Sequence, residues 1–159
     1  MISETDMKHL RRSVELAKEA LEKGDQPFGS VLVSKDGEVL FEDHNHIAGG
    51  DYTQHPEFNI ARWAGQNLPE SERAETTVYT SGEHCPMCSA AHGMAGLGRI
   101  VYVSSSKQFN EWKEEFDVEE TPRINGFAIE EMIVDAKVEG PVPELATVVK
   151  ELQRQYFGE

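Results

Sequence analysis

Hydrophobic residues near the N-terminus recur with the spacing of an α-helix. Over residues 5–23 they are separated by steps of four and three, which places them on one face, while Arg, Glu and Lys fill most other positions. The members of this stripe are Leu10, Val14, Ala17 and Leu21. Gly24 follows and is expected to end the helix.

The pattern then changes to short apolar runs that are typical of strands. Residues 28–34 and 39–44 flank a Lys-Asp-Gly-Glu turn, so they predict a β-hairpin. The unbroken apolar run Val31-Leu32-Val33 indicates a strand that is covered on both faces. Two further runs of β-branched and aromatic residues predict strands over residues 77–81 and 100–103.

Two helices are predicted between these strands, over residues 56–66 and 86–95, each with a proline in its first turn. Residues 71–76 are expected to form a polar connection. Alternation of strands and helices indicates an α/β fold with a central sheet of about five strands and helices on both of its faces. We expect the two helices to lie side by side on one face, with their N-termini close together.

The last third of the chain has a weaker pattern. Within residues 104–126, three aromatic residues have the spacing of a short helix: Phe109, Trp112 and Phe116. They would form either a small additional hydrophobic cluster beside the core or a lid that covers a substrate. Residues 127–134 predict the fifth strand, and residues 144–156 predict a final helix. Tyr156 and Phe157 would anchor that helix.

Composition indicates one globular domain over residues 1–159. Hydrophobic residues make up 38% of the chain and charged residues 28%, and no apolar run approaches the roughly 18 residues of a membrane helix. The polar, acidic N-terminus shows no signal peptide, so we expect a cytoplasmic protein without a membrane partner.

The formal net charge of −14, from 29 acidic and 15 basic residues, disfavours a nucleic-acid partner, which would need Lys and Arg on the binding face. The one local concentration of basic residues is Lys8 with Arg11 and Arg12, far in sequence from the motifs described next. The charge favours a small, neutral substrate.

Two short motifs carry candidate chemistry. Cys85 and Cys88 have the spacing with which two thiolates bind one metal ion, although a disulfide or a redox pair has the same spacing. His55, about thirty residues earlier, would add a third ligand and leave the fourth tetrahedral position of a zinc ion open to water, as in catalytic sites. Glu57 would lie beside that water and move its proton to a leaving amine.

A His-x-Glu motif followed by Cys-x-x-Cys resembles the signature of the cytidine deaminase superfamily. Residues 26–31 (Gln-Pro-Phe-Gly-Ser-Val), Asn45 and residues 79–81 are similar to its free-base, nucleoside and tRNA adenosine deaminase branch. The resemblance extends from about residue 10 to residue 103. It implies a three-layer α/β/α cytidine deaminase-like fold and one zinc ion per chain held by His55, Cys85 and Cys88, with Glu57 as the catalytic residue.

The same resemblance implies where a substrate would bind. Asn45 is a candidate for reading a heterocycle through its amide, although Asn also caps turns; Phe28 and His84 are further candidate contacts. Related C-terminal segments close over the pocket, so Tyr156 and Phe157 are candidates for stacking on a base. Relatives also imply a homodimer.

The sequence departs from the family pattern at two positions. Pro56 stands between His55 and Glu57, where relatives carry a residue whose N–H can donate to a substrate carbonyl; Pro has no N–H, so Asn45 alone would read that group or the preferred heterocycle would be unusual. His84 stands where relatives have Pro. His84 could donate a hydrogen bond to substrate, adjust the properties of the metal through contacts with its ligands, or only fill space. As a fourth metal ligand it would occupy the position that water needs, which would abolish catalysis.

The expected function is zinc-dependent hydrolytic deamination of a free purine or pyrimidine base or its nucleoside, guanine-like or cytosine-like, with no nucleic-acid partner. The alternatives are a tRNA-specific adenosine deaminase of the same branch and a non-catalytic zinc or redox module.

Overall fold

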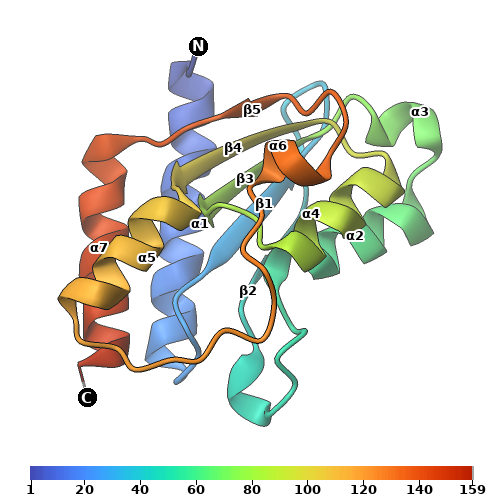
Figure 1. Cartoon of the computed structure of the whole chain (residues 1–159). Coiled ribbons are helices and arrows are strands. Elements are labelled where there is room, and N and C mark those ends of the chain that lie inside the picture. Colours follow the sequence, from blue (N-terminus) through green and yellow to red (C-terminus); the bar gives the residue numbers. More distant parts are fainter. Residues whose placement is uncertain (159) are drawn as a thin grey trace.

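A computed structural model describes residues 1–158 of the chain (Figure 1). Its helices are α1 (Glu4–Glu22), α2 (Pro56–Asn67), α3 (Glu70–Arg73), α4 (Pro86–Ala95), α5 (Ser106–Glu115), α6 (Ile129–Met132) and α7 (Pro143–Phe157), with a 3-10 turn, η1, over Ile47–Gly49. Its strands are β1 (Gly29–Val33), β2 (Val39–His44), β3 (Thr77–Gly82), β4 (Arg99–Ser104) and β5 (Val138–Glu139). No helix in residues 1–158 is long and apolar enough to cross a membrane.

The five strands form one mixed sheet in the order β2-β1-β3-β4-β5. β1 pairs antiparallel with both β2 and β3, whereas β4 pairs parallel with β3 and with β5. The register places Ser30 of β1 opposite Thr80 of β3. The expected sheet of about five strands is confirmed.

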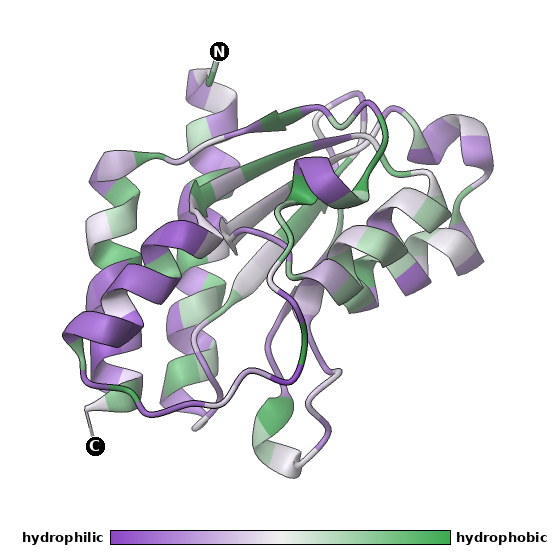
Figure 2. Ribbon diagram, viewed as in Figure 1, coloured by the Kyte–Doolittle hydropathy of each residue, from purple (hydrophilic) through white to green (hydrophobic). Residues whose placement is uncertain are grey.

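Helices cover both faces of the sheet, which confirms the three-layer arrangement (Figure 1). One face packs on α1, α5 and α7, and its core includes Val31 and Val33 of β1. Leu32, between them, points to the other face and packs with Ile60 of α2. Figure 2 shows hydrophobic residues concentrated in the sheet, whereas the outer helix α5 is largely hydrophilic. The unbroken apolar run in β1 follows from burial on both faces.

The strand expected over residues 127–134 is wrong. This segment contains the short helix α6, and the fifth strand is the two-residue β5 further along the chain. Glu131 accepts a hydrogen bond from the N–H of Ala128, which stabilises a helical turn instead of an extended segment. Ile129 is buried but Val134 is 89% exposed, so the apolar residues here do not share one buried strand face. The expected polar connection over residues 71–76 likewise contains part of α3.

The short helix expected around Phe109 is confirmed as α5. Ser105 caps its N-terminus and forms a reciprocal capping box with Gln108. Trp112 is buried in the core between α5, the sheet and α7, so it belongs to the hydrophobic core. Phe109 is only partly buried and also contacts the cavity described below.

A buried polar network joins the N-terminus of α1 to the sheet. Asp6 accepts two hydrogen bonds from the Arg99 guanidinium, at 2.9 and 3.0 Å, and a third from the Tyr79 hydroxyl at 2.6 Å. The Arg99 guanidinium holds the pKa of Asp6 well below its usual range, because its hydrogen bonds favour the carboxylate. The network therefore stabilises the folded chain only while Asp6 is ionised.

We expect Asp6→Asn to lower the free energy of unfolding by about 1–3 kcal/mol at pH 7, because a neutral amide replaces the carboxylate that pairs with the Arg99 guanidinium. The folded-state pKa lies below the unfolded value of about 3.9, so the difference from wild type is fully present above pH 4 and shrinks as pH falls below it. Urea unfolding between pH 3 and pH 7 measures this. Asp36→Asn, in the exposed hairpin turn, is the control; a difference that stays constant at acid pH would contradict the assignment.

Candidate metal centre and active site

Two helix N-termini position the three candidate metal ligands. His55 is the N-cap residue of α2 and Cys85 is the N-cap residue of α4, and each is followed by a proline at the first helical position. Pro is tolerated there because the N–H that it lacks would have no partner inside the helix. α2 and α4 lie side by side on one face of the sheet, as expected (Figure 1). Their N-termini therefore bring together motifs that are thirty residues apart in sequence.

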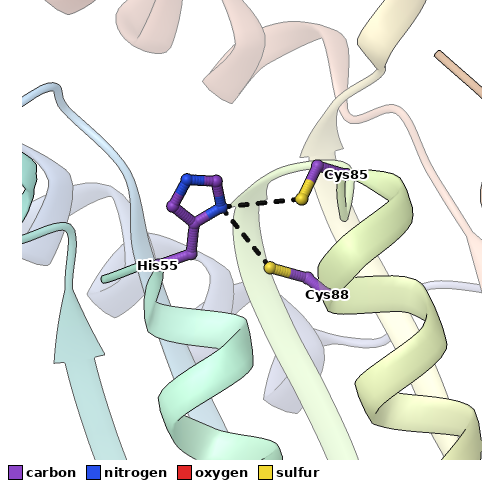
Figure 3. A group of neighbouring side chains, drawn as sticks. All are labelled: His55, Cys85 and Cys88. Atoms are coloured by element: carbon purple, nitrogen blue, oxygen red, sulfur yellow. Dashed lines mark hydrogen bonds between the residues drawn. The ribbon is translucent and has the colours of Figure 1, made fainter. Parts of the chain in front are cut away.

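The geometry of the three side chains fits a zinc ion. Nδ1 of His55 lies 3.5 Å from Sγ of Cys85 and 3.5 Å from Sγ of Cys88, and Figure 3 shows the imidazole directed toward both sulfurs. Nitrogen and sulfur ligands at about 2.0–2.1 and 2.3 Å from one tetrahedral zinc ion would lie roughly 3.5 Å apart. The cysteines are free thiols and form no disulfide.

The thiols differ in pKa because of their mutual contact. A hydrogen bond from Cys88, together with one from His55, lowers the pKa of Cys85 to about 4 in spite of its burial. The same contact with Cys85, and burial, raise the pKa of Cys88. One thiolate is therefore favoured at neutral pH even without a cation, and a cation would favour the second.

Glu57 lies in the first turn of α2 and is 6% exposed. Its Oε1 accepts hydrogen bonds from the hydroxyls of Ser30 (2.7 Å) and Thr80 (2.9 Å). Burial raises the pKa of Glu57, whereas the nearby His55 and the two hydroxyls oppose that rise. A carboxylate that is fixed through one oxygen and has a raised pKa is suited to proton transfer near neutral pH.

Sequence reasoning missed Ser30 and Thr80 as partners of Glu57. Both are buried polar residues in strands whose other positions are mostly apolar, and they face each other across β1 and β3. The hydroxyl oxygens of Ser30 and Thr80 also lie 2.8 Å apart. Polar residues inside apolar strands were the available signal, but only the strand register shows that they meet.

A cavity of about 200 Å³ opens next to the three candidate ligands. It brings together four of the residues expected at the site: Phe28, Asn45, His55 and Cys85. Residues that sequence reasoning did not assign also line it, among them Gln26, Glu83, Ser105, Phe109 and Glu120. Phe28 and Phe109 meet edge to face, with ring centroids 5.6 Å apart. The cavity thus has an aromatic wall and several polar groups.

Asn45 presents a defined hydrogen-bonding group to this cavity. Its Oδ1 accepts from the N–H of Ile47 at 2.9 Å, which leaves the amide Nδ2 as the donor for a ligand. Asn45 is 2% exposed, so only a molecule within the cavity can reach it. The turn-capping role and the ligand-reading role considered from sequence are therefore compatible in one side chain.

The structure places His84 away from the cavity. Its side chain is fully buried and does not belong to the cavity lining. Its ring packs edge to face on His92, with centroids 5.3 Å apart, and neither ring nitrogen has a hydrogen-bond partner within residues 1–158. Burial lowers the pKa of His84 well below its usual value, and the neighbouring His92 lowers it further, so the ring is neutral. The ring fills space in the interior.

The C-terminal aromatic residues lie behind the cavity wall. The ring centroid of Phe157 is 6.3 Å from that of Phe109, and Tyr156 packs edge to face on Phe157 at 5.1 Å. Neither residue belongs to the cavity lining within this chain. Phe157 thus contacts Phe109, which itself lines the cavity, and Tyr156 contacts Phe157.

Known proteins resemble this chain in sequence and in fold. Residues 3–104 match the family described as the cytidine and deoxycytidylate deaminase zinc-binding region. A probable cytosine deaminase of Schizosaccharomyces pombe is 31% identical over 106 residues, which are 67% of this chain and 64%, just under two thirds, of the yeast protein. A tRNA-specific adenosine deaminase of Streptococcus pyogenes is 26% identical over 117 residues, 73% of each chain.

The X-ray structure of guanine deaminase from Bacillus subtilis is 29% identical and superimposes with a TM-score of 0.58 over 76% of this chain and 82% of that one. The family match covers well over half of the 159 residues and includes both metal-centre motifs. This chain therefore belongs to the cytidine and deoxycytidylate deaminase family.

Proposed function

We propose that this chain hydrolytically deaminates a small heterocyclic base, guanine-like or cytosine-like, or its nucleoside. One observation carries the proposal: His55, Cys85 and Cys88 converge with zinc-ligand spacing at the edge of a cavity, and the buried carboxylate of Glu57 lies in the same turn as His55. In such a reaction water replaces an exocyclic amine, which leaves as ammonia.

Each residue has a separate task in this proposal. His55, Cys85 and Cys88 would hold zinc, which supplies Lewis-acid activation of water at near-neutral pH. Glu57 would take a proton from water and pass it to the ring and to the departing amine, through the oxygen that Ser30 and Thr80 do not fix. Asn45 would orient the ring by donating to its carbonyl oxygen, and Phe28 would pack against the ring.

The cavity favours a single base over a larger substrate. Its volume of about 200 Å³ is below the roughly 300–1,000 Å³ of pockets for drug-sized ligands. Its lining contains no lysine or arginine but includes the carboxylates of Glu83 and Glu120. A phosphate-bearing substrate would find no cationic group at this lining, whereas a neutral base needs none.

An ammonia-release assay of the zinc-loaded protein tests the proposal. The panel comprises guanine, cytosine, adenine, other amino-substituted purines and pyrimidines, and the matching nucleosides. We expect turnover of at least one base that carries a ring carbonyl as well as the exocyclic amine. Zinc binding without ammonia release from any of them would support the alternative of a non-catalytic zinc module.

The tRNA adenosine deaminase relative supplies a second candidate function. Charge argues against it, because the basic concentration on α1 is partly neutralised: Arg12 pairs with Glu42 at 2.7 Å and with Glu15 at 3.1 Å. A filter-binding measurement with tRNA at low salt distinguishes the two. Tight, salt-sensitive tRNA binding together with adenosine-to-inosine conversion would favour this second function.

If Asn45 reads a substrate carbonyl, Asn45→Asp should lower kcat/KM for the preferred base by about tenfold or more. The aspartate keeps an oxygen for the N–H of Ile47 but replaces the Nδ2 donor with a group that repels a carbonyl oxygen. Steady-state kinetics on the best base from the panel measure the effect. An unchanged KM and kcat would contradict this role.

Pro56→Ala is the companion variant, because it restores the backbone N–H that family relatives carry at this position. If Asn45 is the sole donor to the ring oxygen, the new N–H should shift the relative kcat/KM values across the panel. Identical preferences in wild type and variant would count against a substrate-reading role for this position.

The homodimer and the cytoplasmic location stay predictions. Light scattering coupled to size-exclusion chromatography of the zinc-loaded protein tests the first. A dimer would allow residues of a second chain to reach the cavity, in line with the expectation for the C-terminal aromatics.

A further inference from the structure

A second group of side chains that could hold a metal ion includes both chain neighbours of Asn45. Asp25 is in the turn after α1, His44 is the last residue of β2, and His46 is two residues further along. One ligand atom from each lies within 4.8 Å of the other two. Asp25 and His44 are buried, whereas His46 is exposed to solvent.

The hydrogen bonds of the two histidines fix which nitrogen is available. Nδ1 of His44 donates to the backbone oxygen of Asn45 at 2.8 Å, so its Nε2 carries the lone pair. Nε2 of His46 donates to Oδ1 of Asp43 at 2.8 Å, so its Nδ1 carries the lone pair. A metal-binding imidazole characteristically donates its other N–H to a backbone carbonyl or a carboxylate, and both histidines have that arrangement.

The carboxylate of Asp25 is held in the same way. Its Oδ1 accepts the N–H of Ala48 at 2.8 Å, which fixes the side chain against η1 and leaves Oδ2 to act as a ligand. Two imidazole nitrogens and one carboxylate oxygen form a donor set suited to first-row divalent metals and leave further coordination positions for water.

Lys23 brings a cation to this group. Its Nζ lies 3.2 Å from Nε2 of His44, on the lone-pair side of that ring. Lys23 is exposed, so its flexible side chain can move into solvent when another cation approaches. An incoming ion must displace it, which makes this site weaker than one with two thiolates.

We propose that Asp25, His44 and His46 form a second site for a divalent transition-metal ion, distinct from the cysteine centre. Two hydrogen bonds connect the site to the segment that carries Asn45, which lines the cavity. His44 donates to the backbone oxygen of Asn45, and Asp25 accepts from the N–H of Ala48 in the turn that follows. An ion there would fix the segment that leads from Asn45 toward His55. The proposal needs no turnover and does not depend on the proposed function.

Calorimetric titration with Co²⁺ of protein whose cysteine centre is already loaded with zinc tests this site. We expect one further Co²⁺ per chain in the wild type. His46→Ala should weaken that binding at least tenfold, because even loss of an outer partner of a metal ligand costs about 10–100-fold. Asp25→Asn, which keeps an acceptor for Ala48, should also weaken it.

Two further variants make the result specific. Lys23→Ala should tighten Co²⁺ binding, because it removes the competing ammonium group. Asp51→Asn alters an exposed carboxylate of the same loop outside the group, where an Asn can still accept from Thr53, and should leave the affinity unchanged. Absence of a second Co²⁺ from both wild type and Lys23→Ala would overturn the proposal, as would undiminished binding in His46→Ala.

Discussion

Replacing Glu57 by glutamine is expected to leave the metal bound and to abolish deamination. The glutamine oxygen can accept the hydroxyls of Ser30 and Thr80, so the side chain keeps its place. It cannot take a proton from water and pass it on. We expect kcat to fall by more than the roughly 10²–10⁴-fold typical of general acid–base catalysis, because the same group serves several proton transfers.

Ammonia release and metal analysis on the same preparation measure this effect. Glu70→Gln, which neutralises an exposed carboxylate at the start of α3, is the control and should retain both metal and activity. Near-full activity in Glu57→Gln would show that another group moves the proton. Loss of metal in that variant would show that Glu57 supports the centre instead of the reaction.

Cys88→Ser is expected to remove the metal and, with it, all turnover. Cys88 is fully buried at the centre, and the serine hydroxyl is a poor substitute for a thiolate toward zinc. An ion that binds the folded chain but not the unfolded chain adds about 4 kcal/mol to the free energy of unfolding when its free concentration is about a thousand times its Kd. For a chain of this size that corresponds to roughly 8–16 °C in Tm. The variant should lose that increment.

Thermal unfolding with and without a chelator separates metal loss from general damage. The chelator should lower the Tm of the wild type and leave that of Cys88→Ser unchanged, since the variant has no ion to lose. Met87→Leu, the neighbouring sulfur-containing residue in α4, is the control and should behave as wild type. A full complement of zinc in Cys88→Ser would contradict the assignment of this ligand.

The elements that carry the metal centre could be predicted from local pattern. Hydrophobic spacing defined α1, β1 and β2 to within two residues, and a proline after His55 and after Cys85 marked the starts of α2 and α4. These signals are short-range, because helix periodicity, strand runs and capping involve residues that are neighbours in the chain. The placement of the two helices on one face followed from the α/β alternation.

Contacts between distant segments could not be read from such patterns. β5 has two residues and exists because it pairs with β4, so no apolar run announces it, whereas the more strand-like residues 127–134 hold α6. The partners of Glu57 depend on the register between β1 and β3. His84 was considered beside the metal because of its sequence position, yet its side chain is directed to His92 in the interior.

The sequence by itself therefore determined the order of helices and strands and the side chains that could bind a metal, because both depend on residue type and on spacing within a few turns. Only the tertiary structure decided that His55 reaches both sulfurs, that Glu83, Phe109 and Glu120 line one cavity, and that Asp25 meets His44 and His46. Those distances are set by sheet register and by the packing of helices on its faces, and both join residues far apart in the chain.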